Sequence, residues 1–242
     1  MFCTCLCNMN GVARVNQKLL AIECLRTLKQ SRTFRELSKE VGLPAGVINR
    51  YINGNVLPKS TRAADVLKQF EKKYFREQLL KESYAKKSKY LVTSTILSKP
   101  FYMRFIASHV AHYFPEKVDK VLTAAVDGIP LAFAIADFLG AEAIYAKQTQ
   151  EFTFSGHYVS KLPHTERPLE TPFYLPSNLL KKNEKVLICD DVIRGGRTLF
   201  ALLSICKQAK AEVVGIYSIF MGKNALKKLD DYKTGYMMTI ED

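Results

Sequence analysis

The sequence predicts an α/β protein in which an all-helical N-terminal part precedes a larger part built on a parallel sheet. Residues 14–80 contain short amphipathic segments without strand alternation, whereas strand-like and helix-like segments alternate from residue 101 onward. The charge divides in the same way, because residues 1–99 hold 19 Lys+Arg and 7 Asp+Glu, a net charge of +12 within a total of +13. We expect an extended or disordered segment (1–13), a helical domain (14–80), a linker with an entry strand (81–99) and an α/β domain (100–242).

The overall composition narrows the class of protein. Of 242 residues, 48% are hydrophobic and 24% charged, which excludes a disordered chain. No apolar run is long enough to span a bilayer and no signal-peptide pattern opens the chain, so we expect a cytoplasmic protein without a membrane partner. The six cysteines contain no C-x-x-C pair and there are only four histidines, so no zinc site is expected.

The basic N-terminal part contains a pattern of two short helices. Thr33 and Glu36 form a predicted capping box at the start of the first helix, and Gly42 is a suitable end for it. Pro44 suits the start of the second helix, in which Val47, Ile48, Tyr51 and Ile52 recur at helical spacing. The pattern predicts a helix-turn-helix. The net charge of +12 by itself fits a solvated lysine-rich surface as well as a nucleic-acid-binding part, and only together with the helix pattern does it favour a nucleic-acid partner.

The stretch 33–58 resembles the Cro/repressor-type helix-turn-helix family. The positions that match in register are Thr33, Leu37, Gly42, Ile48, Arg50 and Gly54, while Phe34 and Pro44 replace the usual glutamine and serine. The resemblance implies DNA binding by a homodimer. By position, the candidates for contact with base edges are Ala45, Gly46, Asn49 and Arg50. Lys59 and Arg62, just beyond, are candidates for contact with phosphate.

The C-terminal part predicts crossover helices over a parallel sheet. Helices are expected over Phe101–Phe114, Pro130–Leu139 and Thr198–Ala209, and strands over Lys120–Ala125, Ala143–Ala146, Lys185–Cys189 and Val213–Phe220. The stretch Gln148–Pro176 fits neither period, and long loops of this kind are usually functional or mobile.

A phosphate loop is predicted directly after the strand Lys185–Cys189. Asp190 and Asp191 follow at its carboxyl end, and the run Arg194, Gly195, Gly196, Arg197, Thr198 then opens a helix. Glycines let backbone N–H groups close on an anion, and the helix N-terminus favours its charge. Carboxylates repel phosphate and suit vicinal hydroxyls, so the pattern predicts a sugar phosphate site.

Residues Val186–Thr198 resemble the phosphoribosyl pyrophosphate (PRPP) fingerprint of type I phosphoribosyltransferases. The resemblance extends over most of residues 90–225 and implies a pyrophosphate loop at Ala125–Gly128, including Asp127 and Gly128. It also implies that Lys147 contacts pyrophosphate, that Gln148–Pro176 is the mobile loop, and that Mg²⁺ comes with PRPP rather than from a protein metal site.

Two departures weaken the pyrophosphate end of the resemblance. The family commonly has an acid at Ala125 and a serine, threonine or arginine at Asp127, and further basic residues where Gln148 and Thr149 stand. The alternative for Asp127 is an ordinary loop residue that pairs with Lys147.

Three functions remain open. The first is a transcriptional regulator of nucleotide metabolism, mainly of purines, that senses PRPP or a purine nucleotide; it resembles archaeal orotate phosphoribosyltransferase-like regulators and the plan of bacterial purine repressors. The second is an active purine-type phosphoribosyltransferase that makes a nucleoside monophosphate from a base and PRPP. The third is an RNA-binding attenuation protein on the same fold. No catalytic residue is assigned. The basic helical part favours the first, because an enzyme needs no such part.

Overall fold

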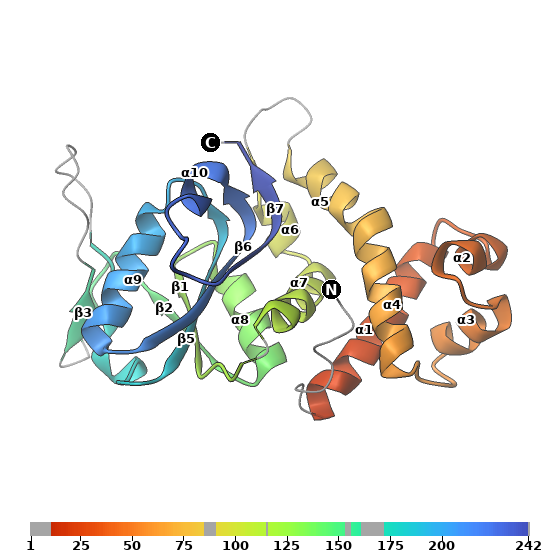
Figure 1. Cartoon of the computed structure of the whole chain (residues 1–242), viewed down its shortest axis with the longest axis horizontal. Helices are drawn as coiled ribbons and strands as arrows, with labels where there is room; N and C mark the ends of the chain where they lie inside the picture. The colour runs from red at the N-terminus through yellow and green to blue at the C-terminus, as the bar shows by residue number, and fades with distance from the viewer. Residues whose placement is uncertain (1–10, 85–90, 115, 153–155, 161–171, 242) are drawn as a thin grey trace. The chain divides into compact units, whose positions relative to one another are not determined.

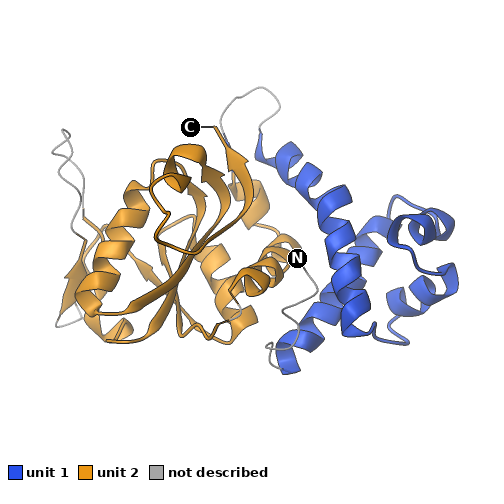
Figure 2. Cartoon of the chain, in the orientation of Figure 1, with its two compact units in different colours: residues 1–92 blue, residues 93–242 orange. Residues whose placement is uncertain are grey.

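The computed structural model describes residues 11–84, 91–114, 116–152, 156–160 and 172–241. The chain forms two compact units, residues 1–92 and 93–242 (Figure 2). Residues 11–13, predicted to be extended or disordered, already belong to the first helix. In the described part of 81–99 the predicted entry strand is absent, and Ser94–Leu97 form a short helix, α6. None of the helices in the described ranges has the length and apolar character needed to cross a membrane.

Unit 1 is helical, as predicted. Its helices are α1 (Gly11–Lys29), α2 (Phe34–Val41), α3 (Ala45–Ile52), α4 (Ser60–Phe70) and α5 (Arg76–Ser83), with the π-helical segment Glu71–Phe75 joining α4 to α5. Helix α1 packs along α4, and α2 packs against α3. Leu25, Leu37, Ile48, Leu67 and Phe70 are fully buried and form its core.

The turn between α2 and α3 has the predicted local geometry. The backbone N–H of Thr33 donates to Glu36 Oε2 at 2.7 Å, and the N–H of Glu36 donates to Thr33 Oγ1 at 3.3 Å, which completes the capping box. Gly42 ends α2 at φ +68°, a left-handed conformation that favours glycine. Pro44 is the residue immediately before the first residue of α3. These caps fix where α2 begins and ends and where α3 begins.

Unit 2 contains the predicted parallel sheet. The strands β1 (Lys120–Ala124), β2 (Glu142–Ala146), β5 (Lys185–Ile193), β6 (Glu212–Gly222) and β7 (Thr234–Ile240) lie in the order β2-β1-β5-β6-β7 (Figure 1). All four adjacent pairs are parallel. The predicted helices are present as α7 (Pro100–Tyr113), α8 (Ile129–Leu139) and α9 (Arg197–Ala209), and a short α10 (Lys223–Leu226) follows β6.

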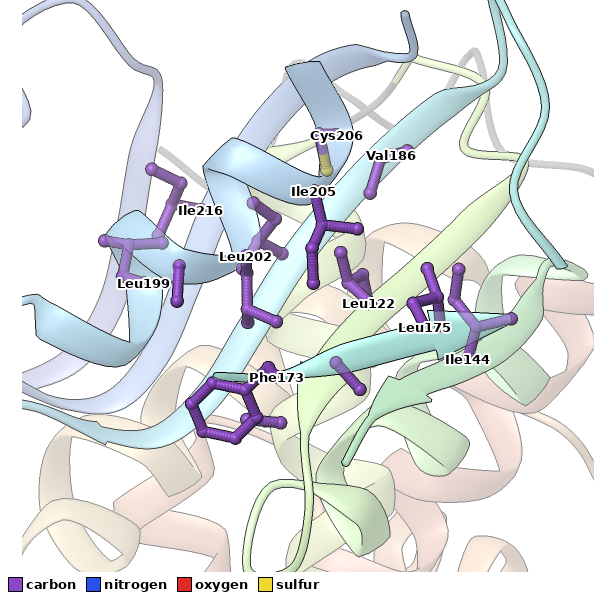
Figure 3. Close-up of a cluster of buried hydrophobic side chains, with 14 of the residues drawn as sticks. Leu122, Ile144, Phe173, Leu175, Val186, Leu199, Leu202, Ile205, Cys206 and Ile216 are labelled. Atoms are coloured by element: carbon purple, nitrogen blue, oxygen red, sulfur yellow. The ribbon is translucent and has the colours of Figure 1, made fainter. Parts of the chain in front are cut away.

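Helices cover both faces of this sheet (Figure 1). On one face, α9 contributes Leu202 and Ile205 to a buried cluster with Leu122 of β1 and Val186 of β5 (Figure 3). On the other face, α8 packs against β1 and β5, and His109 of α7 is hydrogen-bonded to Tyr217 Oη of β6 at 3.0 Å. Burial on both faces explains the continuous apolar run Val186–Cys189 of the central strand β5.

The stretch Gln148–Pro176 contains two short strands that its sequence did not reveal. They are β3 (His157–Val159) and β4 (Tyr174–Pro176), which pair antiparallel, and a 3₁₀ turn, Ser177–Leu179, follows them. The predicted mobile loop falls largely on residues 153–155 and 161–171, which lie outside the described residues. Backbone hydrogen bonds join Lys147 to Tyr174, so the hairpin is attached to the end of β2.

Candidate functional site

The two predicted ligand-binding segments of unit 2 meet at the carboxyl ends of β1 and β5. These strands are parallel neighbours with Leu122 opposite Ile188, so the loop after β1 lies beside the acids of β5. A Cβ on Gly128 would lie 2.0 Å from Thr123 Oγ1 and 3.0 Å from Asp190 Oδ1. Only glycine allows the loop to approach Asp190 this closely. The carboxyl edge of a parallel sheet is the usual place for ligands in such folds.

The two acids are part of the strand rather than of the turn after it. Strand β5 continues to Ile193, past its predicted end at Cys189. The N–H of Asp191 donates to Asp190 Oδ1 at 3.0 Å, and the hydroxyl of Thr93 donates to Asp191 Oδ2 at 2.5 Å. Sequence analysis missed Thr93, because no local pattern links two residues that are 98 positions apart.

The electrostatics of this edge favour a ligand that brings hydrogen-bond donors. Burial raises the pKa of Asp190 well above its ordinary value, and the neighbouring charges of Asp191 and Asp127 raise this pKa further. A buried carboxylate without a cation is costly unless donors satisfy it. The vicinal hydroxyls of a ribose supply such donors, whereas a phosphate group at neutral pH does not.

The predicted phosphate loop borders a cavity of about 310 Å³, a volume within the usual range for ligand sites. The cavity is lined by Asp190 and by the loop residues Arg194, Gly195, Gly196, Arg197 and Thr198, together with apolar neighbours. Gly196 precedes α9 at φ +82°, a left-handed conformation that favours glycine, and the first N–H groups of the helix, as in any α-helix, have no intrahelical partner. Arg194 and Arg197 are exposed, and Lys228 Nζ lies 3.5 Å from the carbonyl oxygen of Gly195. An anion is the ligand that this loop can hold.

Lys147 lies at the end of β2, but its side chain is engaged elsewhere. Its ammonium group pairs with Glu151 and lies 5.3 Å from the ring centroid of Tyr145. The hydrogen bond to Glu151 raises the pKa of Lys147. The alternative in which Asp127 pairs with Lys147 is therefore wrong. The backbone remains close to the loop, since the N–H of Ala125 donates to the carbonyl of Ala146 at 2.8 Å.

A second cavity, of about 170 Å³, lies beside this lysine. Tyr145, Lys147, Glu151, His157 and Tyr174 contribute to its lining, so it is bounded by β2 and the β3–β4 hairpin. The structure thus places the Lys147 side chain in a different cavity from Asp190 and the phosphate loop.

Asp190, which lines the first cavity, and its neighbour Asp191 do not form a metal-binding cluster by themselves. In the described part of the chain, no group of three or more His, Cys, Asp and Glu side chains is arranged to hold a metal ion. Carboxylate oxygens suit Mg²⁺, which usually keeps several waters or ligand oxygens in its shell. Asp190 and Asp191 fit a Mg²⁺ ion that is carried by the oxygens of a bound ligand.

The candidate nucleic-acid interface is the outer face of α3 in unit 1. Ile48 and Tyr51 are buried, and the four residues predicted to contact bases, Ala45, Gly46, Asn49 and Arg50, are all exposed. Asn53 Nδ2 donates to Asn49 Oδ1 at 3.1 Å, which orients the Asn49 side chain.

Basic residues lie on and beside this face. Lys59, immediately before α4, and Arg62, in its first turn, are exposed. Arg62 Nη1 donates to Tyr51 Oη at 3.2 Å, which ties α4 to α3. Within the described ranges Arg50 and Lys59 have no ion-pair partner, so their charges are available to a polyanion.

Comparison with known proteins places unit 2 in one family. The phosphoribosyl transferase domain matches residues 98–241. The chain is 30% identical over 152 residues to a probable purine biosynthesis transcriptional regulator PurR of Streptococcus pneumoniae, covering 60% of this chain and 54% of that protein. It is 28% identical over 147 residues to the purine biosynthesis transcriptional repressor PurR of Bacillus subtilis, covering 59% and 50% respectively. The chain thus spans about half the length of these regulators.

Enzymes are also among the similar proteins. A hypoxanthine/guanine phosphoribosyltransferase of Methanococcus vannielii is 28% identical over 148 residues, covering 60% of this chain and 77% of that protein. The adenine phosphoribosyltransferase structure from Rhodothermus marinus has a TM-score of 0.59 at 18% identity and covers 68% of this chain and 98% of that chain. At this identity the structural likeness shows the fold alone, which is the type I phosphoribosyltransferase fold predicted from the sequence.

Proposed function

Since this chain belongs to the phosphoribosyl transferase domain family, we propose that it is a DNA-binding regulator of purine nucleotide metabolism. In this proposal unit 2 binds PRPP or a purine nucleotide, and unit 1 binds DNA as a helix-turn-helix. The observation that carries it is the exposed face of α3, with Asn49 and Arg50 outward and Ile48 buried beneath them. Phosphoribosyl transfer does not require an exposed helix face of this kind.

The roles in unit 2 follow from the chemistry of each segment. Asp190 and Asp191 accept hydrogen bonds from the ribose hydroxyls, and the backbone N–H groups of residues 194–198 bind the 5′-phosphate with help from Arg194 and Arg197. The loop with Asp127 and Gly128, and Lys147 if it leaves Glu151, border the place of the C1 substituent. With PRPP bound, Mg²⁺ would neutralise charge between the pyrophosphate and these acids.

The roles in unit 1 follow from exposure. Ala45, Gly46, Asn49 and Arg50 contact base edges, where asparagine pairs bidentately with adenine and arginine with guanine. Lys59 and Arg62 contact phosphates. A homodimer would place two copies of α3 about 34–36 Å apart, one helical turn of DNA.

Some of the similar proteins support this proposal, and others support a second one. PurR regulators favour a regulator of purine metabolism, and the resemblance to archaeal regulators stays a prediction from sequence. The hypoxanthine/guanine phosphoribosyltransferase relative favours an enzyme, a nucleoside monophosphate synthase that uses PRPP. The exposed α3 face and the engagement of Lys147 with Glu151 favour the regulator.

The experiment that tests the proposal uses the full chain in two assays. In the first, the protein selects duplexes from a random DNA pool at low salt, and binding of the selected sequence is followed as salt increases. We expect a shared, two-fold symmetric sequence and a steep loss of affinity with salt. In the second, the protein is mixed with PRPP, Mg²⁺ and each purine base. If nucleotide forms in the second assay and no DNA sequence is selected in the first, the regulator proposal is wrong and the enzyme proposal takes its place.

A further inference from the structure

We propose that the outer edge of β2 is a docking site for an extended peptide segment of a partner protein, which adds to the sheet beside this strand. The site is the cavity of about 170 Å³ between β2 and the β3–β4 hairpin, to which the proposed function gives no ligand. The inference depends neither on the ligand of the other cavity nor on DNA binding, because it concerns a different part of unit 2.

Strand β2 turns half of its backbone groups away from the sheet. It is an edge strand, with β1 as its neighbour in the order β2-β1-β5-β6-β7 (Figure 1). The N–H of Glu142 and the carbonyl of Ala146 bond to the residues that flank β1. Because alternate residues of a parallel strand face the same neighbour, the even-numbered residues of β2 all face β1. The backbone N–H and C=O groups of Ala143 and Tyr145 therefore point outward.

The cavity runs along this outward edge. Four consecutive residues, Glu142–Tyr145, contribute to its lining. Consecutive side chains of a strand point to opposite faces, so a cavity on one face of the sheet would miss half of them. The backbone edge is what presents all four residues to one space. Among the described residues, no hydrogen bond engages the outward groups of Ala143 or Tyr145.

Pro176 is the reason why the hairpin does not close this edge. The N–H of Lys147 donates to the carbonyl of Tyr174 at 3.0 Å, and the N–H of Tyr174 donates back at 2.7 Å, so an antiparallel ladder begins there. The next bonded pair, two residues further along each chain, would be Tyr145 with Pro176. Proline has no N–H to donate, and the 3₁₀ turn Ser177–Leu179 then ends the extended conformation. The cavity is thus the gap in an interrupted ladder.

An extended backbone is the chemistry that matches this edge. The outward groups recur every second residue, about 6.6 Å apart, which is also the repeat of a neighbouring β-strand. The cavity of about 170 Å³ is smaller than the usual range of roughly 300–1,000 Å³ for small-molecule sites. A peptide fits the smaller space, because a short part of it enters while the rest of its chain lies outside. Addition of a strand to an open sheet edge is a recurrent mode of peptide recognition.

The walls of the cavity indicate which side chain the peptide carries. Tyr145, His157 and Tyr174 contribute aromatic rings, and aliphatic groups complete the lining. The rings of His157 and Tyr174 lie edge to face, with centroids 6.4 Å apart. Such walls favour an aromatic or large aliphatic residue. Lys147 and Glu151, which also line the cavity, neutralise each other, so the peptide needs no particular charge.

The test begins with amide hydrogen exchange of the full-length protein. In the protein alone, the amides of Ala143 and Tyr145 should exchange rapidly, whereas those of Ile144 and Ala146, which face β1, should be protected. A phage-displayed random heptapeptide library is then selected against the protein, and the enriched peptide is synthesised. We expect an aromatic or large aliphatic residue flanked by residues other than proline. The peptide should slow exchange at Ala143 and Tyr145 about tenfold or more.

Two variants remove the site in different ways. Ala143→Pro deletes an outward N–H and leaves the ladder with β1 intact, as proline on an edge strand can. It should weaken the enriched peptide at least about three- to tenfold, the value of one hydrogen bond. Pro176→Val supplies an N–H opposite Tyr145, so the hairpin should extend its ladder, close the cavity and also weaken the peptide. Ala143→Ser is the matched control, because it retains the N–H and should bind as the wild type does.

Each outcome decides for or against the docking site. Circular dichroism verifies that the variants are folded, and either folded variant suffices for the comparison. Slow exchange of Ala143 and Tyr145 in the protein alone overturns the open edge. If that protection rises with protein concentration, a second copy occupies the edge instead of a partner peptide. A library without enrichment, or an enriched peptide that the folded variants bind as tightly as the wild type, overturns peptide docking.

Discussion

The hydroxyl of Thr93 donates a hydrogen bond of 2.5 Å to Oδ2 of Asp191. Thr93 is the first residue of unit 2, immediately after the division between the units at Val92. Asp191 is one of the two acids that we propose to bind ribose. We propose that a ribose hydroxyl displaces Thr93 from this carboxylate oxygen, so that ligand binding acts on the residue that begins the second unit. A ligand shifts DNA affinity only if it interacts differently with the two arrangements of the protein.

Thr93→Val should therefore weaken the response to ligand. The variant keeps the shape of the side chain and loses the hydroxyl, so ligand no longer competes with it. We expect ligand to change the DNA affinity of the wild type by about 1–3 kcal/mol, and the variant to lose most of this change. DNA titrations with and without ligand measure it. Thr239→Val, an exposed threonine of β7, is the matched control, and a full response in Thr93→Val would disprove the competition.

Gly196→Val should abolish ligand binding and leave the fold intact. The backbone at Gly196 has φ +82°, and a Cβ there would lie 3.1 Å from the Phe200 ring. A left-handed conformation costs a non-glycine residue roughly 1–2 kcal/mol, so the loop rearranges and its N–H groups no longer converge on the phosphate. Gly195→Ala is the control, since its Cβ would meet nothing within 4 Å. Calorimetry with ribose 5-phosphate distinguishes them, and normal binding by Gly196→Val would refute the phosphate loop.

Arg50→Ala and Lys59→Ala should weaken DNA binding in different ways. Arg50 lies on the exposed face of α3, so its loss should cost roughly 1–3 kcal/mol and relax the preference at one base position. Lys59 precedes α4, and its loss should weaken all sequences alike and reduce the salt dependence by about one phosphate contact. Affinity measurements on the selected sequence and its single-base variants separate these effects. If both variants lose the same affinity on every sequence, the proposed placement of α3 in the major groove is wrong.

Asp190→Asn should stabilise the protein at neutral pH. Because the pKa of Asp190 is raised in the folded protein, ionisation of this carboxyl lowers the free energy of unfolding. The protonated carboxyl therefore contributes its full stabilisation below the ordinary pKa of 3.8, and this stabilisation is lost as the pH rises toward the folded pKa. Asparagine still accepts the Asp191 N–H without the charge. Urea unfolding in EDTA should show equal stabilities at about pH 3 and a gain of about 1 kcal/mol in the variant near pH 8. A gain that shrinks with rising pH would contradict this sign.

Much of the fold was predictable because local rules and tertiary packing agree. The capping box of Thr33 and Glu36, the left-handed Gly42 and the buried run before Asp190 are each sufficient to place an element. The hairpin β3–β4 was missed because three-residue strands are too short for a period to show. The strand β7 was missed because Thr234–Ile240 contains both polar and apolar residues without clean alternation.

The site was predictable only where it is contiguous in sequence. Asp190 to Thr198 follow one another, and the parallel pairing of β1 with β5 brings Gly128 to them. Thr93 and Lys228 approach Asp191 and Gly195 from segments that are distant in sequence. Their partners depend on tertiary contacts, which no motif specifies.

The measurement that tests the central claim most directly is a DNA titration of the wild type and of the double variant Asp190→Asn, Asp191→Asn, each with and without a purine nucleotide or PRPP. The account predicts that ligand shifts the wild-type curve by about 1–3 kcal/mol in affinity. The double variant should bind DNA as the wild type does without ligand, and ligand should leave its curve unmoved, because the acids that hold the ribose are gone. Four identical curves would mean that unit 2 is not a sensor, and the enzyme would become the better account.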